Sequence, residues 1–182
     1  MLNRLISLFA GKQHNPAAVA LYRCIVEQAR QPDFYTHHGV PDSLDGRFDM
    51  IVLHTFLVMR RLRTIASQAA GHLSQDLFDL LFADMDSNLR EIGVGDLGVG
   101  KRVKKMAQAF YGRVEAYEAG LTATDDAILT DALTRNLYGT TQPALPNQLA
   151  MAAYMRAAEA RLADQSEAKI LAGNVYFPAA PV

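Results

Sequence analysis

The segment at residues 50–59 constrains the fold most strongly, because nearly every one of its side chains is apolar. This run lies inside a longer segment, residues 44–70, whose apolar positions recur at helical spacing. A helix that is apolar almost all round must be buried on most of its sides. The sequence therefore predicts a core helix at about residues 44–70.

Helical spacing also marks the segments on either side of this core helix. Asn15 and Pro16 are a typical helix start, and the stripe after them predicts a helix over residues 16–30. Ser74 can cap a helix that ends in a glycine cluster at residues 93–100, and the next helix should close near Gly120. A shorter helix should follow Thr122 and stop at Gly139. The four stripes consist of Ala18, Leu21, Tyr22, Ile25 and Ala29; Phe78, Phe82, Met85, Leu89 and Ile92; Val103, Met106, Phe110, Val114 and Tyr117; and Leu129, Leu133 and Leu137.

The remaining segments complete the expected organisation. The alanine-rich stretch at residues 147–171 has strong helix propensity, whereas the prolines and glycine at residues 32–43 predict a loop. No run of β-branched residues alternates over strand length. We therefore predict an all-α fold, a single-domain helical bundle of about seven helices with short loops. With 182 residues and 50% hydrophobic composition, the chain can bury one core, and the helical domain is expected at residues 15–173.

The two ends of the chain are expected to differ from this domain. Residues 1–14 should form a short amphipathic helix, since Leu2, Leu5, Ile6 and Phe9 fall on one helical face. That face is a candidate membrane contact, and docking on the domain is the alternative. The proline-bearing tail at residues 174–182 is expected to end the order of the chain after Gly173.

Composition excludes several classes of protein. The 18 basic and 19 acidic residues give a formal net charge of -1, so the protein as a whole is not a strongly basic polyanion binder, and DNA is not an expected partner. The single cysteine, Cys24, indicates a reducing compartment, and we expect it to be a buried structural residue. The sequence has no secretion signal pattern and no apolar run of transmembrane length, which favours a cytoplasmic location.

Several motifs match on letters only. Residues 93–101 contain a dinucleotide fingerprint and nearly a P-loop, but both require a preceding β-strand, whereas an amphipathic helix is expected there. The acidic residues after Asp84 imitate a calcium loop, but Leu89 and Gly95 occupy its glycine and glutamate positions. No catalytic motif and no convincing set of metal ligands is present. We therefore expect a protein that is not an enzyme and has no metal or cofactor.

Four basic residues form the most unusual charge feature. Lys101, Arg102, Lys104 and Lys105 are expected to open a helix, where the positive end of the dipole would favour acidic residues instead. Together with free backbone N–H groups they could form an anion site. The alternative is a solvated face that is neutralised by Asp84, Asp86 or Glu91 across the turn. A small-ligand or phosphate-binding protein that uses the turn from Gly93 to Lys105 is the corresponding alternative function.

A second polar cluster precedes the apolar run. Arg47 could pair with Asp45, Asp42 or an acid near Asp84, while His54 lies inside the packed segment. A lone histidine in such a segment is more often a hydrogen-bonded core residue than a catalyst. We interpret the cluster as a buried polar tie between two helices and the loop at residues 32–43.

Three blocks of the sequence resemble one known family. They read PDFYTHHGVPDSLDGRFDMIVLHTFLVMRRL, then DMDSNLREIGVGDLGVGKRVKKMAQAFYGRVEAY, then ALTRNLYG. In this order they are similar to the signature blocks of the ubiquinol-cytochrome c chaperone family in its short bacterial form. The resemblance implies an all-helical assembly factor for the cytochrome bc1 complex that binds newly made cytochrome b. In that family, mitochondrial members act near the ribosome exit together with a small partner protein.

The resemblance also selects residues of this chain. Asp45, Gly46, Arg47 and His54 match one block, and we assign them mainly to architecture. Residues 98–105 with Tyr111, Gly112 and Arg113 match the other. The candidate partner-binding residues are Lys101, Arg102, Lys104, Lys105, Tyr111 and Arg113. Their expected partners are nascent cytochrome b or another bc1 subunit, the ribosome and an anionic membrane surface, reached by a basic edge and an apolar groove between helices. The expected location is then cytoplasmic and peripheral on the inner membrane.

Overall fold

The structure is a computed structural model, and it describes residues 14–139 and 141–181. Its helices are α2 (Pro16–Ala29), α3 (Asp33–Thr36), α4 (Leu44–Arg63), α5 (Gln68–Glu91), α6 (Asp96–Thr122), α7 (Ala127–Asn136), α8 (Leu145–Ala163) and α9 (Glu167–Leu171). No strand occurs among the described residues, and the predicted all-α fold is confirmed. Within the same residues, no helix combines the length and the hydropathy that crossing a bilayer requires.

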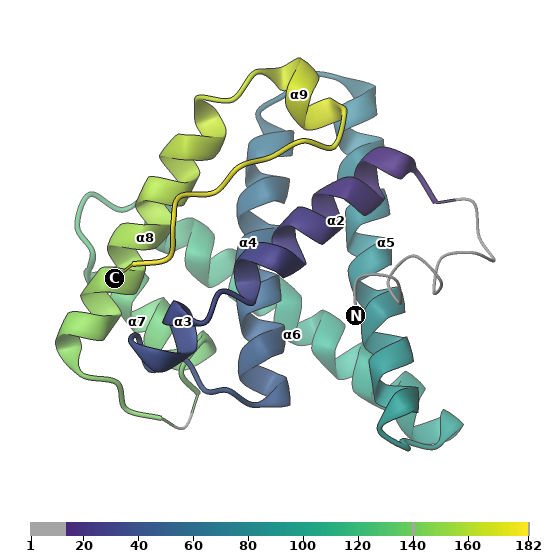
Figure 1. Cartoon of the computed structure of the whole chain (residues 1–182), viewed down its shortest axis with the longest axis horizontal. Helices are drawn as coiled ribbons and strands as arrows, with labels where there is room; N and C mark the ends of the chain where they lie inside the picture. Colours follow the sequence, from purple (N-terminus) through teal and green to yellow (C-terminus); the bar gives the residue numbers. More distant parts are fainter. Residues whose placement is uncertain (1–13, 140, 182) are drawn as a thin grey trace.

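Helix α4 is the centre of the fold (Figure 1). Helix α2 crosses α4 and α5 on one side, α6 crosses them on the other, and α8 packs along α4 next to α7. Every residue of α4 from Phe48 to Val58 is buried. The prediction of a core helix is therefore confirmed, and its apolar circumference reflects neighbours on all sides.

The boundary between α4 and α5 differs from the predicted one. The core helix ends at Arg63, not at residue 70, and Ser67 rather than Ser74 caps α5. The Ser67 hydroxyl accepts a hydrogen bond from the Ala70 N–H at 3.2 Å. Ile65 in the turn is buried in the core. The helical pattern of the sequence runs on through this turn, so local propensity does not reveal it. Burial of the Ile65 side chain in the core stabilises the turn instead.

The glycine cluster is only partly a turn. Helix α6 begins at Asp96, so Gly98 and Gly100 lie inside it, and Gly93 supplies the turn with its φ of +86°. Val99 in this first turn is fully buried. At its other end α6 continues past Gly120 to Thr122. A Cβ at Gly120 would lie 2.7 Å from Leu129 Cα, so this glycine permits a close approach of α7 and does not end the helix.

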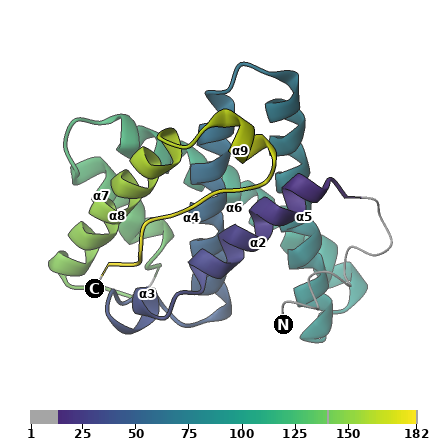
Figure 2. The same ribbon diagram turned by 45° about the horizontal axis from the view of Figure 1, so that its top comes forward.

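The C-terminal part is more ordered than predicted. The alanine-rich segment forms two helices, α8 and α9, with a turn at residues 164–166. The expectation that order ends at Gly173 is wrong, because Val175 and Ala180 are buried. Figure 2 shows the tail running from α9 between α2 and α8. Gln28 Nε2 donates to the carbonyl of Pro178 at 2.9 Å, which ties the tail to α2.

The predicted loop at residues 32–43 also contains regular structure. Helix α3 is a single turn that places Phe34 fully inside the core. The neighbouring Tyr35 hydroxyl donates to the carbonyl of Ala29 at 2.6 Å. His38 is buried as well, and its Nε2 lies 2.9 Å from the carbonyl oxygen of Pro181 in the tail. This segment therefore connects α2 to the core and to the C-terminal tail.

Candidate functional site

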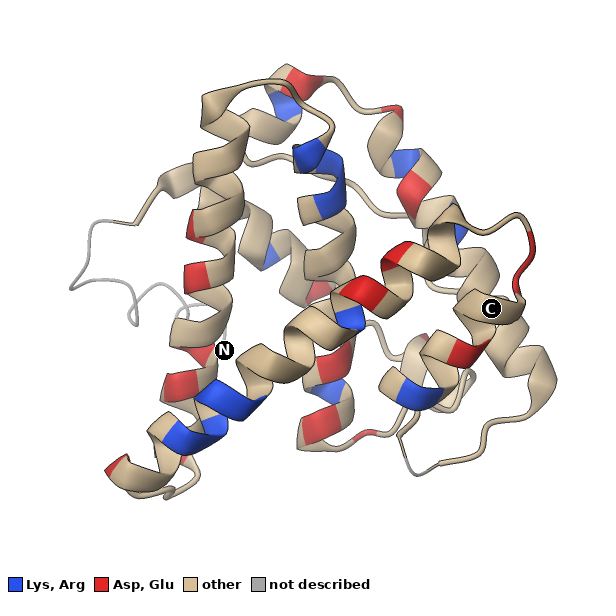
Figure 3. Cartoon of the chain, turned by 180° about the vertical axis from the view of Figure 1, so that it is seen from behind, with Lys and Arg blue, Asp and Glu red and all other residues tan. Residues whose placement is uncertain are grey.

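An open groove lies between the second half of α4, the start of α5 and the middle of α6. Its volume is about 430 Å³. In Figure 3, α6 is the helix that crosses in front of α4 and α5. The groove is lined by Phe56, Met59, Arg60, Leu62, Arg63 and Ile65 from α4 and its end, by Ser67, Ala70, Gly71 and Ser74 from α5 and its cap, and by Phe110, Tyr111 and Val114 from α6. The lining is mainly apolar, which suits an apolar ligand or side chains of a partner.

Phe110 and Tyr111, which line the groove from α6, pack against Phe78 and Phe82 of α5. The rings of Phe78 and Phe110 are 5.4 Å apart and edge to face, and Phe82 lies 4.7 Å from Phe78. Tyr111 packs 5.8 Å from both Phe78 and Phe110, yet 61% of its surface is exposed. The cluster therefore holds Tyr111 from behind and leaves its outer face free for contact.

The two arginines that line the groove, Arg60 and Arg63, both form ion pairs. Arg60 binds Glu118 at 2.8 Å and Glu159 at 2.7 Å, and Arg63 binds Glu118 at 2.7 Å. These pairs connect α4 to α6 and α8. Because each arginine has a carboxylate partner, its charge is largely neutralised. The apolar side chains of the lining therefore determine what the groove can hold.

The four predicted cations lie further along α6, towards its start. Lys101, Arg102, Lys104 and Lys105 are all exposed. None of them forms an ion pair with another described residue. However, the helix begins five residues before Lys101, so the expected free backbone N–H groups beside these side chains are absent. The predicted anion site in this form is wrong, because Asp96 occupies the first turn of the helix instead.

The acids expected to neutralise these cations have other partners. The Asp84 carboxylate is buried, accepts a hydrogen bond from the Tyr22 hydroxyl at 2.8 Å, and has a pKa that burial raises. Asp86 pairs with Arg90 at 2.6 Å, and Arg90 also contacts Asp96. Neutralisation by Asp84 or Asp86 is therefore wrong, and the basic row formed by Lys101, Arg102, Lys104 and Lys105 faces solvent.

Arg113 does not belong to this exposed surface. Its side chain is mostly buried, and its guanidinium lies 2.8 Å from the Asp49 carboxylate. It also donates to the carbonyls of Asn136 and Ala109, each at 3.3 Å. Burial raises the pKa of Asp49 to about 7, although the charge of Arg113 acts in the opposite direction. Sequence reasoning missed Asp49, whose signal is an acid directly before the apolar run.

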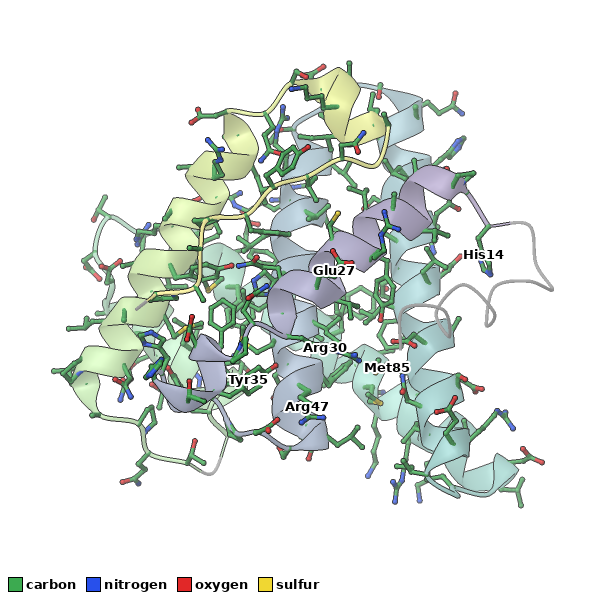
Figure 4. The ribbon with its side chains drawn as sticks, in the orientation of Figure 1. His14, Glu27, Arg30, Tyr35, Arg47 and Met85 are labelled. Atoms are coloured by element: carbon green, nitrogen blue, oxygen red, sulfur yellow. The ribbon has the colours of Figure 1, made fainter. Side chains whose placement is uncertain are left out.

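The other predicted cluster separates into exposed and buried parts. Arg47 pairs with Asp42 at 2.6 Å on the surface, and Asp45 is exposed, so the predicted buried tie does not include them. Figure 4 shows Arg47 near Tyr35, at the start of α4. Gly46 is buried, and a Cβ there would lie 2.1 Å from the carbonyl oxygen of Pro41. Only glycine allows the chain to enter α4 so close to its own preceding turn.

His54 forms the buried polar tie. Its Nδ1 donates to the Met50 carbonyl at 2.8 Å, and its Nε2 accepts from the Tyr154 hydroxyl at 2.7 Å. Gln28 donates to the same hydroxyl at 3.0 Å. Phe34 and Phe177 pack edge to face on the imidazole. Burial lowers the pKa of His54 to about 4, so the ring is neutral near pH 7.

Two further expectations concern chemistry and membrane contact. The described residues include no group of three or more His, Cys, Asp or Glu side chains that could hold a metal ion. Cys24 is half-buried, and burial raises the pKa of its thiol, which disfavours the reactive thiolate. The candidate membrane contacts Leu2, Leu5, Ile6 and Phe9 lie outside the residues that the structure describes.

The fold and the site together define a single-domain all-α protein with an open apolar groove and an exposed basic row. The sequence model of the ubiquinol-cytochrome C chaperone family matches residues 36–177. The chain therefore belongs to this family, which confirms the resemblance of its sequence blocks. The match extends through α8 to Phe177 in the tail.

Individual relatives agree with this membership. The chain is 26% identical over 121 residues to ubiquinol-cytochrome-c reductase complex assembly factor 1 of Xenopus laevis, covering 66% of this chain and 60% of that protein. It is 30% identical over 108 residues to Protein CBP3, mitochondrial, of Saccharomyces cerevisiae, covering 58% and 32%. The chain thus spans less than two thirds of the length of each of these relatives.

A solved structure shows the same fold. The crystal structure of the Cbp3 homolog from Brucella abortus is 37% identical to this chain. The two superpose with a TM-score of 0.82, and the comparison covers 99% of this chain and 98% of the other. This chain therefore shares its fold with that Cbp3 homolog over nearly its whole length.

Proposed function

We propose that this protein is a non-catalytic assembly factor of the cytochrome bc1 complex and binds newly synthesised cytochrome b. Membership of the chaperone family supports this role, as do relatives whose names describe ubiquinol-cytochrome-c reductase complex assembly. The protein needs no cofactor for it. It works in the cytoplasm, at the inner face of the membrane into which its client is inserted.

The groove between α4, α5 and α6 is the observation that carries this proposal. At about 430 Å³ it falls within the range of ligand pockets, roughly 300–1,000 Å³, and has room for a few apolar side chains of a helix. A segment of cytochrome b would place residues at positions i, i+3 and i+4 into such a groove. Met59 can adjust to different side chains, as binding of more than one segment requires, and Tyr111 offers an exposed ring beside it.

The basic row lies on the same helix as Tyr111 and provides a second contact. From Lys105 to Tyr111 the helix rises about 9 Å. Acidic loops of the client, the ribosome or anionic lipid headgroups can reach the row while an apolar segment occupies the groove. In this proposal Lys101, Arg102, Lys104 and Lys105 increase the rate of encounter, and the groove provides most of the affinity.

The geometry does not favour the phosphate-binding alternative. The Asp96 carboxylate stands in the first turn of α6, where a bound phosphate would need free N–H groups and positive potential. The lysine nearest to the turn, Lys101, lies more than one helical turn further along. A phosphate at this position would be repelled by Asp96 and could reach the basic row only at the surface.

A tryptophan at Gly71 tests the groove. A Cβ at Gly71 meets no atom within 4 Å, so Gly71→Trp should fold and fill the space. Gly112→Trp is the matched control, since Gly112 is also an open helical glycine and does not line the groove. Both variants are expressed in cells that lack the wild-type gene. Photocrosslinking to newly made cytochrome b and the haem spectrum of the bc1 complex are then measured.

We expect Gly71→Trp to lose the crosslink and most of the bc1 spectrum, while Gly112→Trp retains both. Thermal unfolding of the purified variants confirms that each is folded. If a folded Gly71→Trp variant crosslinks and supports bc1 assembly like the control, the groove does not hold the client.

A further inference from the structure

The corner between α5 and α6 exposes two large apolar side chains. Ile92 directly follows α5 and is 58% exposed, and Leu97 in the first turn of α6 is 97% exposed. The corner projects from the rest of the molecule (Figures 1 and 3). A side chain as exposed as Leu97 contributes almost no packing to the fold. Its apolar character therefore has no explanation within the described part of this chain.

Glycine surrounds both side chains. Among the described residues, Cβ atoms at Gly93, Gly95 and Gly100 would meet no atom within 4 Å, whereas one at Gly98 would lie 3.0 Å from the side chain of Val94. Ile92 and Leu97 consequently stand clear of the backbone around them. A flat or soft surface could approach the corner without a steric barrier.

Positive charge follows directly behind the apolar residues. Leu97, Lys101 and Lys104 lie on one face of α6, because they are separated by four and three residues. Residues 90–105 contain five basic and two acidic side chains, in a chain whose formal net charge is -1. Two acids flank the apolar residues: Glu91 precedes Ile92, and Asp96 precedes Leu97 and is in contact with Arg90. The excess of positive charge therefore comes from residues 101–105, on the part of α6 that follows the corner.

We infer that this corner docks on an anionic phospholipid bilayer. Ile92 and Leu97 enter the boundary between headgroups and acyl chains, and Lys101, Lys104 and Lys105 bind anionic headgroups beside them. From Leu97 to Lys105 the helix spans about 12 Å, comparable to the depth of the headgroup region and the layer next to it. Apolar insertion combined with anionic attraction is the general chemistry of peripheral membrane binding.

Nucleic acid fits the same observations less well. A phosphate backbone would engage the basic row, but it offers nothing that apolar Ile92 and Leu97 would bind. The docking does not depend on what occupies the groove, since the corner and the groove lie at different parts of α6. The inference and the proposed function can therefore fail separately.

Vesicle binding by the full chain tests this inference without any client. Sedimentation is measured with vesicles of phosphatidylcholine mixed with phosphatidylglycerol, with phosphatidylcholine alone, and at increasing salt. Binding should require phosphatidylglycerol and weaken as salt rises. The double variant Ile92→Ser with Leu97→Ser should bind at least about tenfold more weakly, because the inserted apolar area is removed. Lys101→Gln with Lys104→Gln should lose about fivefold per charge.

A matched variant tests whether any exposed leucine would have this effect. Leu145 and Leu149 are 60% and 46% exposed on α8, and residues 142–155 contain no charged side chain. Leu145→Ser with Leu149→Ser should leave vesicle binding unchanged. Two results would overturn the inference: wild-type vesicle binding by the Ile92 and Leu97 variant, or binding of poly(U) RNA through the basic row without binding to the mixed vesicles.

Discussion

The Nε2 atom of His54 lies 2.7 Å from the hydroxyl oxygen of Tyr154, one hundred residues further along the chain. Gln28 donates to the same hydroxyl, and Phe177 covers the imidazole. A single buried side chain on α4 thereby joins α2, α8 and the C-terminal tail. Because a buried polar group that loses its partner is costly, these four segments are expected to unfold together.

The protonation of His54 should make the stability of the fold depend on pH. Its pKa is about 4 in the folded protein and about 6.5 in the unfolded chain, so the unfolded state binds more protons between these values. The contribution of the neutral ring is complete above pH 6.5 and is lost as pH falls towards 4, by about 3 kcal/mol in total. Urea unfolding of wild type and His54→Gln at several pH values measures it.

The effect of His54 is read from the difference in unfolding free energy between wild type and His54→Gln, because Asp49 changes the stability of both proteins with pH in the opposite direction. The pKa of Asp49 is raised to about 7, so its contribution is largest at low pH and is lost as pH rises from about 4 to 7. The stability advantage of wild type over His54→Gln should shrink on acidification. An advantage that stays constant between pH 7 and 4 would show that His54 is not held neutral.

Loss of Arg113 should destabilise the fold in a pH-dependent way. In Arg113→Met the Asp49 carboxylate keeps its burial and loses its charged partner. At pH 8, where Asp49 is ionised, we expect a loss of about 3 kcal/mol, and at pH 5, where it is protonated, a smaller one. Arg102→Met is the control, with a change of at most about 0.5 kcal/mol expected for an exposed position. Equal losses at both pH values would contradict a role in pairing with Asp49.

Two glycines should respond oppositely to the same substitution. Gly46→Ala places a methyl group against the Pro41 carbonyl, a backbone atom that cannot move aside, and should cost about 2 kcal/mol or more. Gly71→Ala adds a methyl group in open space within α5 and should stabilise the helix by about 0.5–1 kcal/mol. Thermal or urea unfolding distinguishes the two. If Gly46→Ala were as stable as wild type, the close approach at the start of α4 would not exist.

Arg156 is expected to be irreplaceable by lysine. Its guanidinium binds the Asp126 carboxylate at 2.6 Å and donates to the carbonyls of Gly120, Leu121, Ala123 and Asp125 at 3.1 to 3.2 Å. Arg156 on α8 thereby provides hydrogen-bond donors for the carbonyl groups at the C-terminal end of α6 and in the turn that follows it. Lysine cannot reproduce this planar set of donors, so Arg156→Lys should cost about 2 kcal/mol in urea unfolding. Arg161→Lys on the exposed side of α8 should be neutral, and an equal loss in both variants would refute the special role of Arg156.

Part of the candidate site could be predicted from the sequence. Charge and the family blocks single out the cations at residues 101–105 and Tyr111, and all of them are exposed. The same family block groups Arg113 with them, because it is close to them in the sequence. Its side chain instead points into the fold, and its partner Asp49 is 64 residues away. The groove residues could not be assembled in advance either, since they come from three helices whose crossing depends on packing.

The sequence by itself determined the helical class, the core helix and the family. Apolar spacing is a local property, so the stripes of α2, α4 and α6 can be read directly from the chain, and the motif blocks are continuous. Only the tertiary structure decided where several helices end, why the tail is ordered and which polar groups meet. Ile65 and Val175 are positioned by burial against distant residues, and His54 needs Tyr154. Such choices depend on the free energy of long-range contacts, which local propensity does not contain.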